Sequence, residues 1–106
     1  MMNSAATGLI EVYGLTAACA AADAGCKAAD VTLEIFDRNK PANADALPVP
    51  LLVTVKFRGS VSNVQAAVEA GLRAAKAVSG VVSSHVIPAP EEDVNKMLKI
   101  SGLDKD

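Results

Sequence analysis

The chain has 106 residues and a formal net charge of −2, and 51% of its residues are apolar although only one Tyr and two Phe are aromatic. This length allows one domain. Its core is rich in alanine, and each alanine side chain contributes little stabilisation because it buries little apolar area, at about 25 cal/mol per Å². The net charge and the lack of a basic stripe give no reason to expect a nucleic-acid partner, and no run approaches the ~20 apolar residues of a membrane span. Residues 1–7 also lack the basic start and apolar run of a signal peptide. We therefore expect a cytoplasmic domain whose stability is completed by subunit contacts.

Hydrophobic periodicity and turn residues divide the chain into alternating strands and helices. The predicted elements, in chain order, are a strand at 7–13, a helix at 15–29, a strand at 31–37, a proline-rich loop at 38–50, a strand at 51–58, a helix that follows Gly59, a strand at 81–87 and a short helix from Pro90.

The second long helix carries the clearest signals. Ser62 and Gln65 form a plausible capping box, and Ser79-Gly80 marks the end of the helix. Its apolar stripe is predicted to contain Val61, Val64, Val68, Leu72, Ala75 and Val78. The order β-α-β-β-α-β-α indicates an α/β (α+β) sandwich of the ferredoxin-like class, with an antiparallel four-stranded sheet and both long helices on one face. We expect a single domain at 7–98, with tails at 1–6 and 99–106.

The candidate reactive side chains are few. Cys19 and Cys26 lie seven residues apart in one helix, and we interpret them as buried structural thiols because this spacing matches no common metal site. His85 is the only histidine and is interpreted as a structural residue with satisfied hydrogen bonds, since no nucleophile or carboxylate is spaced to work with it. No metal site or cofactor is predicted.

Three motifs resemble those of the bacterial microcompartment shell proteins of the hexamer-forming type. They are Gly8-Leu-Ile-Glu-Val-Tyr-Gly-Leu-Thr-Ala-Ala, Asp23-Ala-Gly-Cys-Lys-Ala-Ala and His85-Val-Ile-Pro-Ala-Pro-Glu-Glu-Asp-Val. The resemblance covers residues 7–98 and departs at 38–50. It implies the BMC fold and a structural, non-enzymatic subunit that forms homohexamers in the shell of a cytoplasmic microcompartment. The implied partners are copies of itself, other shell hexamers and pentamers, and the encapsulated enzymes.

The resemblance also assigns roles to particular residues. Lys27 matches a lysine at the hexamer edge, and Ala89 occupies the position where the family usually carries an arginine that supports the same edge contact. The loop between the second and third strands lines the central pore in the family, but here it is longer and stiffened by proline. The pore candidates are Arg38, Lys40, Asn43, Ala44, Asp45 and Ala46. Some relatives hold an iron–sulfur cluster through cysteine in this loop, which here contains none.

Two other kinds of protein could share this topology. A small-molecule-sensing regulatory module would need convergent polar groups for a nucleotide or an amino acid, and its relatives are often trimers. A small enzyme of the same sandwich class would need a paired nucleophile and base. Without the resemblance, the pattern indicates only an oligomeric α/β sandwich.

Overall fold

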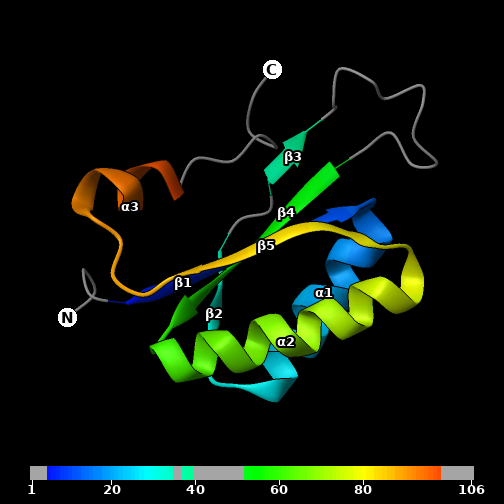
Figure 1. Cartoon of the computed structure of the whole chain (residues 1–106), viewed down its shortest axis with the longest axis horizontal. Coiled ribbons are helices and arrows are strands. Elements are labelled where there is room, and N and C mark those ends of the chain that lie inside the picture. The colour runs from blue at the N-terminus through cyan, green and yellow to red at the C-terminus, as the bar shows by residue number, and fades with distance from the viewer. Residues whose placement is uncertain (1–4, 35–36, 40–51, 99–106) are drawn as a thin grey trace.

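The computed structural model describes residues 5–34, 37–39 and 52–98 (Figure 1). Within these ranges the helices and strands lie close to their predicted positions. They are, in chain order, β1 (Ala6–Tyr13), α1 (Leu15–Ala28), β2 (Thr32–Leu33), β3 (Asp37–Asn39), β4 (Leu52–Gly59), α2 (Val61–Val78), β5 (Val81–Ile87) and α3 (Glu92–Leu98).

The sheet is antiparallel and has the order β2–β4–β1–β5, with β3 paired to β4 beside β2. Four strand positions result, because β2 and β3 occupy successive lengths of one edge. This arrangement and the two long helices confirm the predicted fold class. The first strand begins at Ala6, which is fully buried.

The strand predicted at 31–37 is two short strands, so the prediction of one continuous element was wrong. Leu33 pairs with Phe57 and Asp37 pairs with Thr54. The register against β4 therefore differs by one residue between the two strands. The alternation of side chains in the sequence does not reveal such a change of register.

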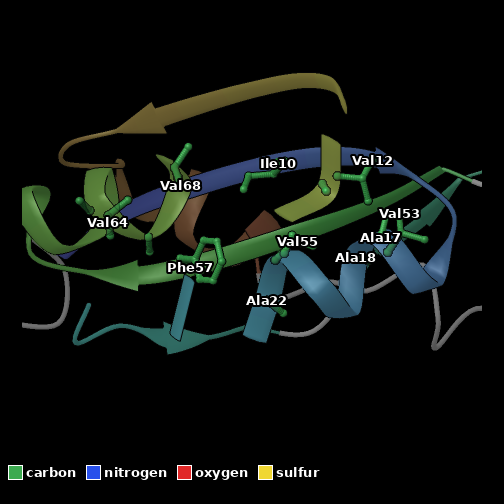
Figure 2. Close-up of a cluster of buried hydrophobic side chains, with 14 residues drawn as sticks. Ile10, Val12, Ala17, Ala18, Ala22, Val53, Val55, Phe57, Val64 and Val68 are labelled. Atoms are coloured by element: carbon green, nitrogen blue, oxygen red, sulfur yellow. The ribbon is translucent and has the colours of Figure 1, made fainter. Parts of the chain in front are cut away.

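Both long helices cover one face of the sheet (Figure 1). The strands contribute large side chains to the core between the sheet and the helices, and the helices contribute mostly alanine (Figure 2). The helices can therefore lie close together and close to the sheet. Gly25 of α1 shows how close: a Cβ atom there would lie 2.6 Å from Phe57 Cε1 and 3.0 Å from the carbonyl oxygen of Ala67 in α2.

The N-cap of α2 differs from the predicted one. Ser60 is the N-cap, and its hydroxyl accepts a hydrogen bond from the backbone N–H of Asn63 at 3.2 Å. The helix thus begins at Val61, one residue before the predicted capping Ser62. The stripe is buried at its middle, but Val61 and Val78 are exposed at its two ends.

Helix α3 lies on the opposite face of the sheet (Figure 1) and is held by polar side chains of β4. Lys56, only 4% exposed, donates from Nζ to the carbonyl oxygen of Leu98 at 3.0 Å. Arg58 Nη1 donates to Asn95 Oδ1 at 2.7 Å. A cation beneath the last carbonyls of a helix complements the helix dipole. The outward-facing residues of β4 therefore fix where the chain runs after β5.

Candidate assembly surfaces

The outer face of α1, defined here as Thr16, Cys19, Asp23, Cys26 and Lys27, turns away from the sheet, and these five residues are all exposed. On this face Lys27 Nζ lies 2.9 Å from Asp23 Oδ2, and the two side chains are 76% and 63% exposed. The hydrogen bond that Lys27 donates to Asp23, and then the negative charge of Asp23, raise the pKa of Lys27 above its ordinary value. Lys27, predicted to lie at the edge, is thus accessible, cationic and paired within its own helix.

Cys19 and Cys26 are both free and exposed, so their interpretation as buried structural thiols was wrong. Their seven-residue spacing does place them on one face of α1, but it is the outer one. The inner face is occupied by alanine and Gly25 because helix, sheet and α2 approach too closely there for a thiol.

The segment from His85 to Pro90 leads from β5 into α3. His85 is exposed on β5, an edge strand of the sheet. It lines a shallow concavity of about 220 Å³ on the face opposite the long helices, together with Leu9, Glu11, Thr54, Ser83 and Ser84. Ala89 is exposed in the turn after β5, whereas Pro90 beside it is buried.

The predicted pore loop is only partly described. Arg38 belongs to β3 and pairs with Val53 of β4. Lys40, Asn43, Ala44, Asp45 and Ala46 lie outside the described residues. The flanking residues Asn39 and Leu52 are cross-strand partners. The chain therefore leaves and re-enters the sheet at one place, on the β4 side.

Exposed large apolar side chains lie at two opposite ends of the molecule. One end contains the start of α1, the end of α2 and the start of β5, where Tyr13 N donates to the carbonyl oxygen of Gly80 at 3.3 Å. Leu15, Val78 and Val82 are there, each 43–49% exposed. The other end contains the end of β4, the start of α2 and β2, with Val61 and Leu33 each 39% exposed. Such paired patches are typical of surfaces that are covered by other subunits.

Other kinds of site receive little support from the described residues. Within the described ranges, no three His, Cys, Asp or Glu side chains gather as metal ligands would. No helix among the described residues is long and apolar enough to span a membrane. The geometry defines a small α/β subunit whose distinctive features lie at its edges and ends.

Comparison with known proteins identifies the family. The model of the BMC domain matches residues 6–90, and the chain belongs to this family. The chain is 43% identical over 97 residues to the bacterial microcompartment shell protein PduA of Citrobacter freundii, covering 92% of this chain and 95% of that one. It is also 43% identical over 97 residues to the carboxysome shell protein CcmK2 of Synechococcus elongatus, covering 90% and 86%.

A solved structure supports the same conclusion. The crystal structure of a microcompartment protein from Desulfitobacterium hafniense matches with a TM-score of 0.69 and 29% identity over 92% of this chain. The match spans 48% of that protein, so this chain is about half its length. The resemblance read from the three motifs is confirmed: the chain is a structural subunit of a bacterial microcompartment shell.

Proposed function

We propose that six copies of this chain close into a ring that serves as one tile of a shell facet. The observation that carries the proposal is the pair of exposed apolar patches at opposite ends of the subunit. A ring requires a heterologous contact in which two different patches of neighbouring copies meet. The patch of Leu15, Val78 and Val82 would pack against the patch of Leu33 and Val61 in the next copy.

The segment that joins β3 to β4 would then face the axis of the ring. Asn39 and Leu52 pair across β3 and β4, so both ends of the loop start from one place on each subunit. Six proline-stiffened loops around one axis would narrow the opening, with Asn43, Ala44, Asp45 and Ala46 nearest the tip. Asp45 would form a negative collar that favours cations over anionic metabolites. The subunit would thus control passage and catalyse nothing itself.

The ring edges would join neighbouring tiles, including hexamers and pentamers of other shell proteins. Lys27 is exposed on α1 and available for such a contact. Ala89 is exposed as well but offers no hydrogen-bond donor in its side chain. Tiles of this chain alone should therefore join more weakly than tiles with arginine at this position, and the chain would suit a minor position among other shell proteins.

Light scattering coupled to size exclusion tests the ring. The expected mass is about 65 kDa, six times that of the 10.8 kDa chain. Val78→Lys at one end and Val61→Lys at the other should each reduce the mass to smaller species, because either change places a charge in the same apolar contact. Ala66→Lys, at an exposed position on α2 away from both ends, should leave the mass unchanged. A wild-type mass of three subunits would contradict the six-membered ring.

A further inference from the structure

Helix α3 covers only one end of the sheet face opposite the two long helices. At that end Arg58 Nη1 donates to Asn95 of α3 at 2.7 Å, and Thr7, the cross-strand partner of Arg58, is fully buried. Further along the strands the same face is hollowed into the concavity of about 220 Å³ that His85 lines. Sites for drug-sized ligands span roughly 300–1,000 Å³, so this smaller hollow suits a molecule of a few non-hydrogen atoms.

Cross-strand pairing brings polar groups together in this concavity. Glu11 of β1 pairs with Thr54 of β4 on one side and with Ser83 of β5 on the other. Side chains paired in this way lie about 4.5–5.5 Å apart at Cβ, so two hydroxyl groups flank the carboxylate. Leu9 lies two residues before Glu11 on the same face of β1 and pairs with His85. An apolar side chain and an imidazole therefore lie beside the carboxylate.

The carboxylate of Glu11 lacks a cationic partner within the ranges that the structure describes. Lys56 is on the same face, but its Nζ donates to the carbonyl oxygen of Leu98 at 3.0 Å. Glu11 is half-buried, and a carboxylate that is partly removed from water gains from a nearby cation. The flanking hydroxyl oxygens can accept further hydrogen bonds. Together these groups favour a cation that carries several donors.

We propose that this concavity binds a small aliphatic ammonium ion. Its three N–H groups would donate to the Glu11 carboxylate and to the hydroxyl oxygens of Thr54 and Ser83, in the way that the ammonium group of lysine offers three donors. Its hydrocarbon chain would pack on Leu9, with His85 at the open rim. All of these residues belong to one subunit, so the binding site goes beyond the proposed ring and does not require it.

A ligand titration followed by NMR tests the site. His85 is the only histidine of the chain, so its ring signals report on the concavity without ambiguity. Butylammonium, which is charged at neutral pH, should shift these signals to saturation at constant ionic strength, with a Kd of about 1 mM for a ligand so small. Butanol and butanoate have the same chain length with a neutral or a negative head group. Each should bind at least about tenfold more weakly.

Matched variants identify the groups that bind. Glu11→Gln keeps the size of the side chain but removes its charge, and should weaken butylammonium binding at least about tenfold. Ser83→Ala removes one acceptor at an exposed position and should weaken binding about threefold to tenfold. Glu69→Gln makes the same change of charge on the exposed surface of α2, and should bind butylammonium as the wild type does.

The assignment is overturned if butylammonium gives no saturable shift, or if butanol or butanoate binds as tightly. It is also overturned if Glu11→Gln binds as the wild type does, or if Glu69→Gln loses binding. Thermal unfolding shows whether Glu11→Gln is folded. Should that variant fail to fold, Ser83→Ala decides instead, because a residue exposed on an edge strand tolerates truncation: unchanged binding in this variant overturns the assignment, and weaker binding supports it.

Discussion

The closest packing in the subunit gives the sharpest prediction about stability. Gly25→Ala adds a methyl group between α1 and its neighbours, where it would meet Phe57 Cε1 at 2.6 Å and the carbonyl oxygen of Ala67 at 3.0 Å. Phe57 is fully buried, and the carbonyl belongs to the backbone of α2, so neither can move aside easily. Overpacking of this kind costs about 1–3 kcal/mol.

A second effect opposes this cost. Replacing glycine with alanine inside a helix stabilises it by about 1 kcal/mol. We expect the overpacking to dominate, with a net loss of up to about 2 kcal/mol in the free energy of unfolding. For a domain of this size a loss of about 2 kcal/mol corresponds to a fall in Tm of roughly 8–16 °C. Ala66→Gly at an exposed position of α2 measures the helix-propensity effect alone, and should cost about 1 kcal/mol.

A double-mutant cycle identifies the cause. Phe57→Leu removes part of the ring that the new methyl group would strike, so Gly25→Ala should cost less in the Phe57→Leu background, with a coupling of about 0.5–3 kcal/mol. Thermal unfolding must be compared at equal subunit concentration, since assembly stabilises the folded state. A Gly25→Ala variant as stable as the wild type, or costs that simply add, would refute this account of the packing.

Three further predictions concern the edge of the subunit and its last helix. Ala89→Arg should promote sheets of rings, because it supplies a donor in an exposed turn; electron microscopy that finds fewer sheets than in wild type contradicts it. Because the pKa of Lys27 is raised, its ion pair with Asp23 contributes to stability at pH values below the ordinary 10.5, and this contribution is lost as the pH rises through the raised pKa. An NMR titration should show a lower pKa for Lys27 in the Asp23→Asn variant. Lys56→Met leaves the carbonyl oxygen of Leu98 without this donor and should destabilise the docking of α3 by about 1–3 kcal/mol; unchanged hydrogen exchange in α3 would contradict that role.

The fold was predictable because its signals are local. Glycine separates strand from helix at Gly14, whose φ of 89° suits glycine far better than other residues. In β4, Val53, Val55 and Phe57 are buried and alternate along the strand with the polar residues Thr54, Lys56 and Arg58. The change of register between β2 and β3 was missed because it depends on pairing with β4, which lies beyond the proline-rich loop in the sequence.

The errors about side chains have a common cause. Residue type predicted burial for Cys19, Cys26 and Val78, yet all three are exposed. Burial depends on which face of an element meets a neighbour and on how far that neighbour extends. Periodicity showed that the two cysteines share one face of the helix but not whether that face is buried or exposed. The exposed valines are now informative, since they belong to the patches proposed to join subunits.

The tight core also bears on how a ring could close. The two apolar ends belong to different elements, and their relative angle is set by how α2 lies on β1. A Cβ atom on Gly8 would lie 2.6 Å from Val68 Cγ2 and 2.7 Å from Val64 Cγ1, so α2 rests almost directly on the strand. At the far end, Ser79 Oγ donates to the carbonyl oxygen of Tyr13 at 2.7 Å and ties α2 to β1. A heterologous contact closes only when each copy is rotated by a fixed fraction of a turn. Small residues inside the subunit would therefore govern the geometry of the assembly without touching any neighbouring copy.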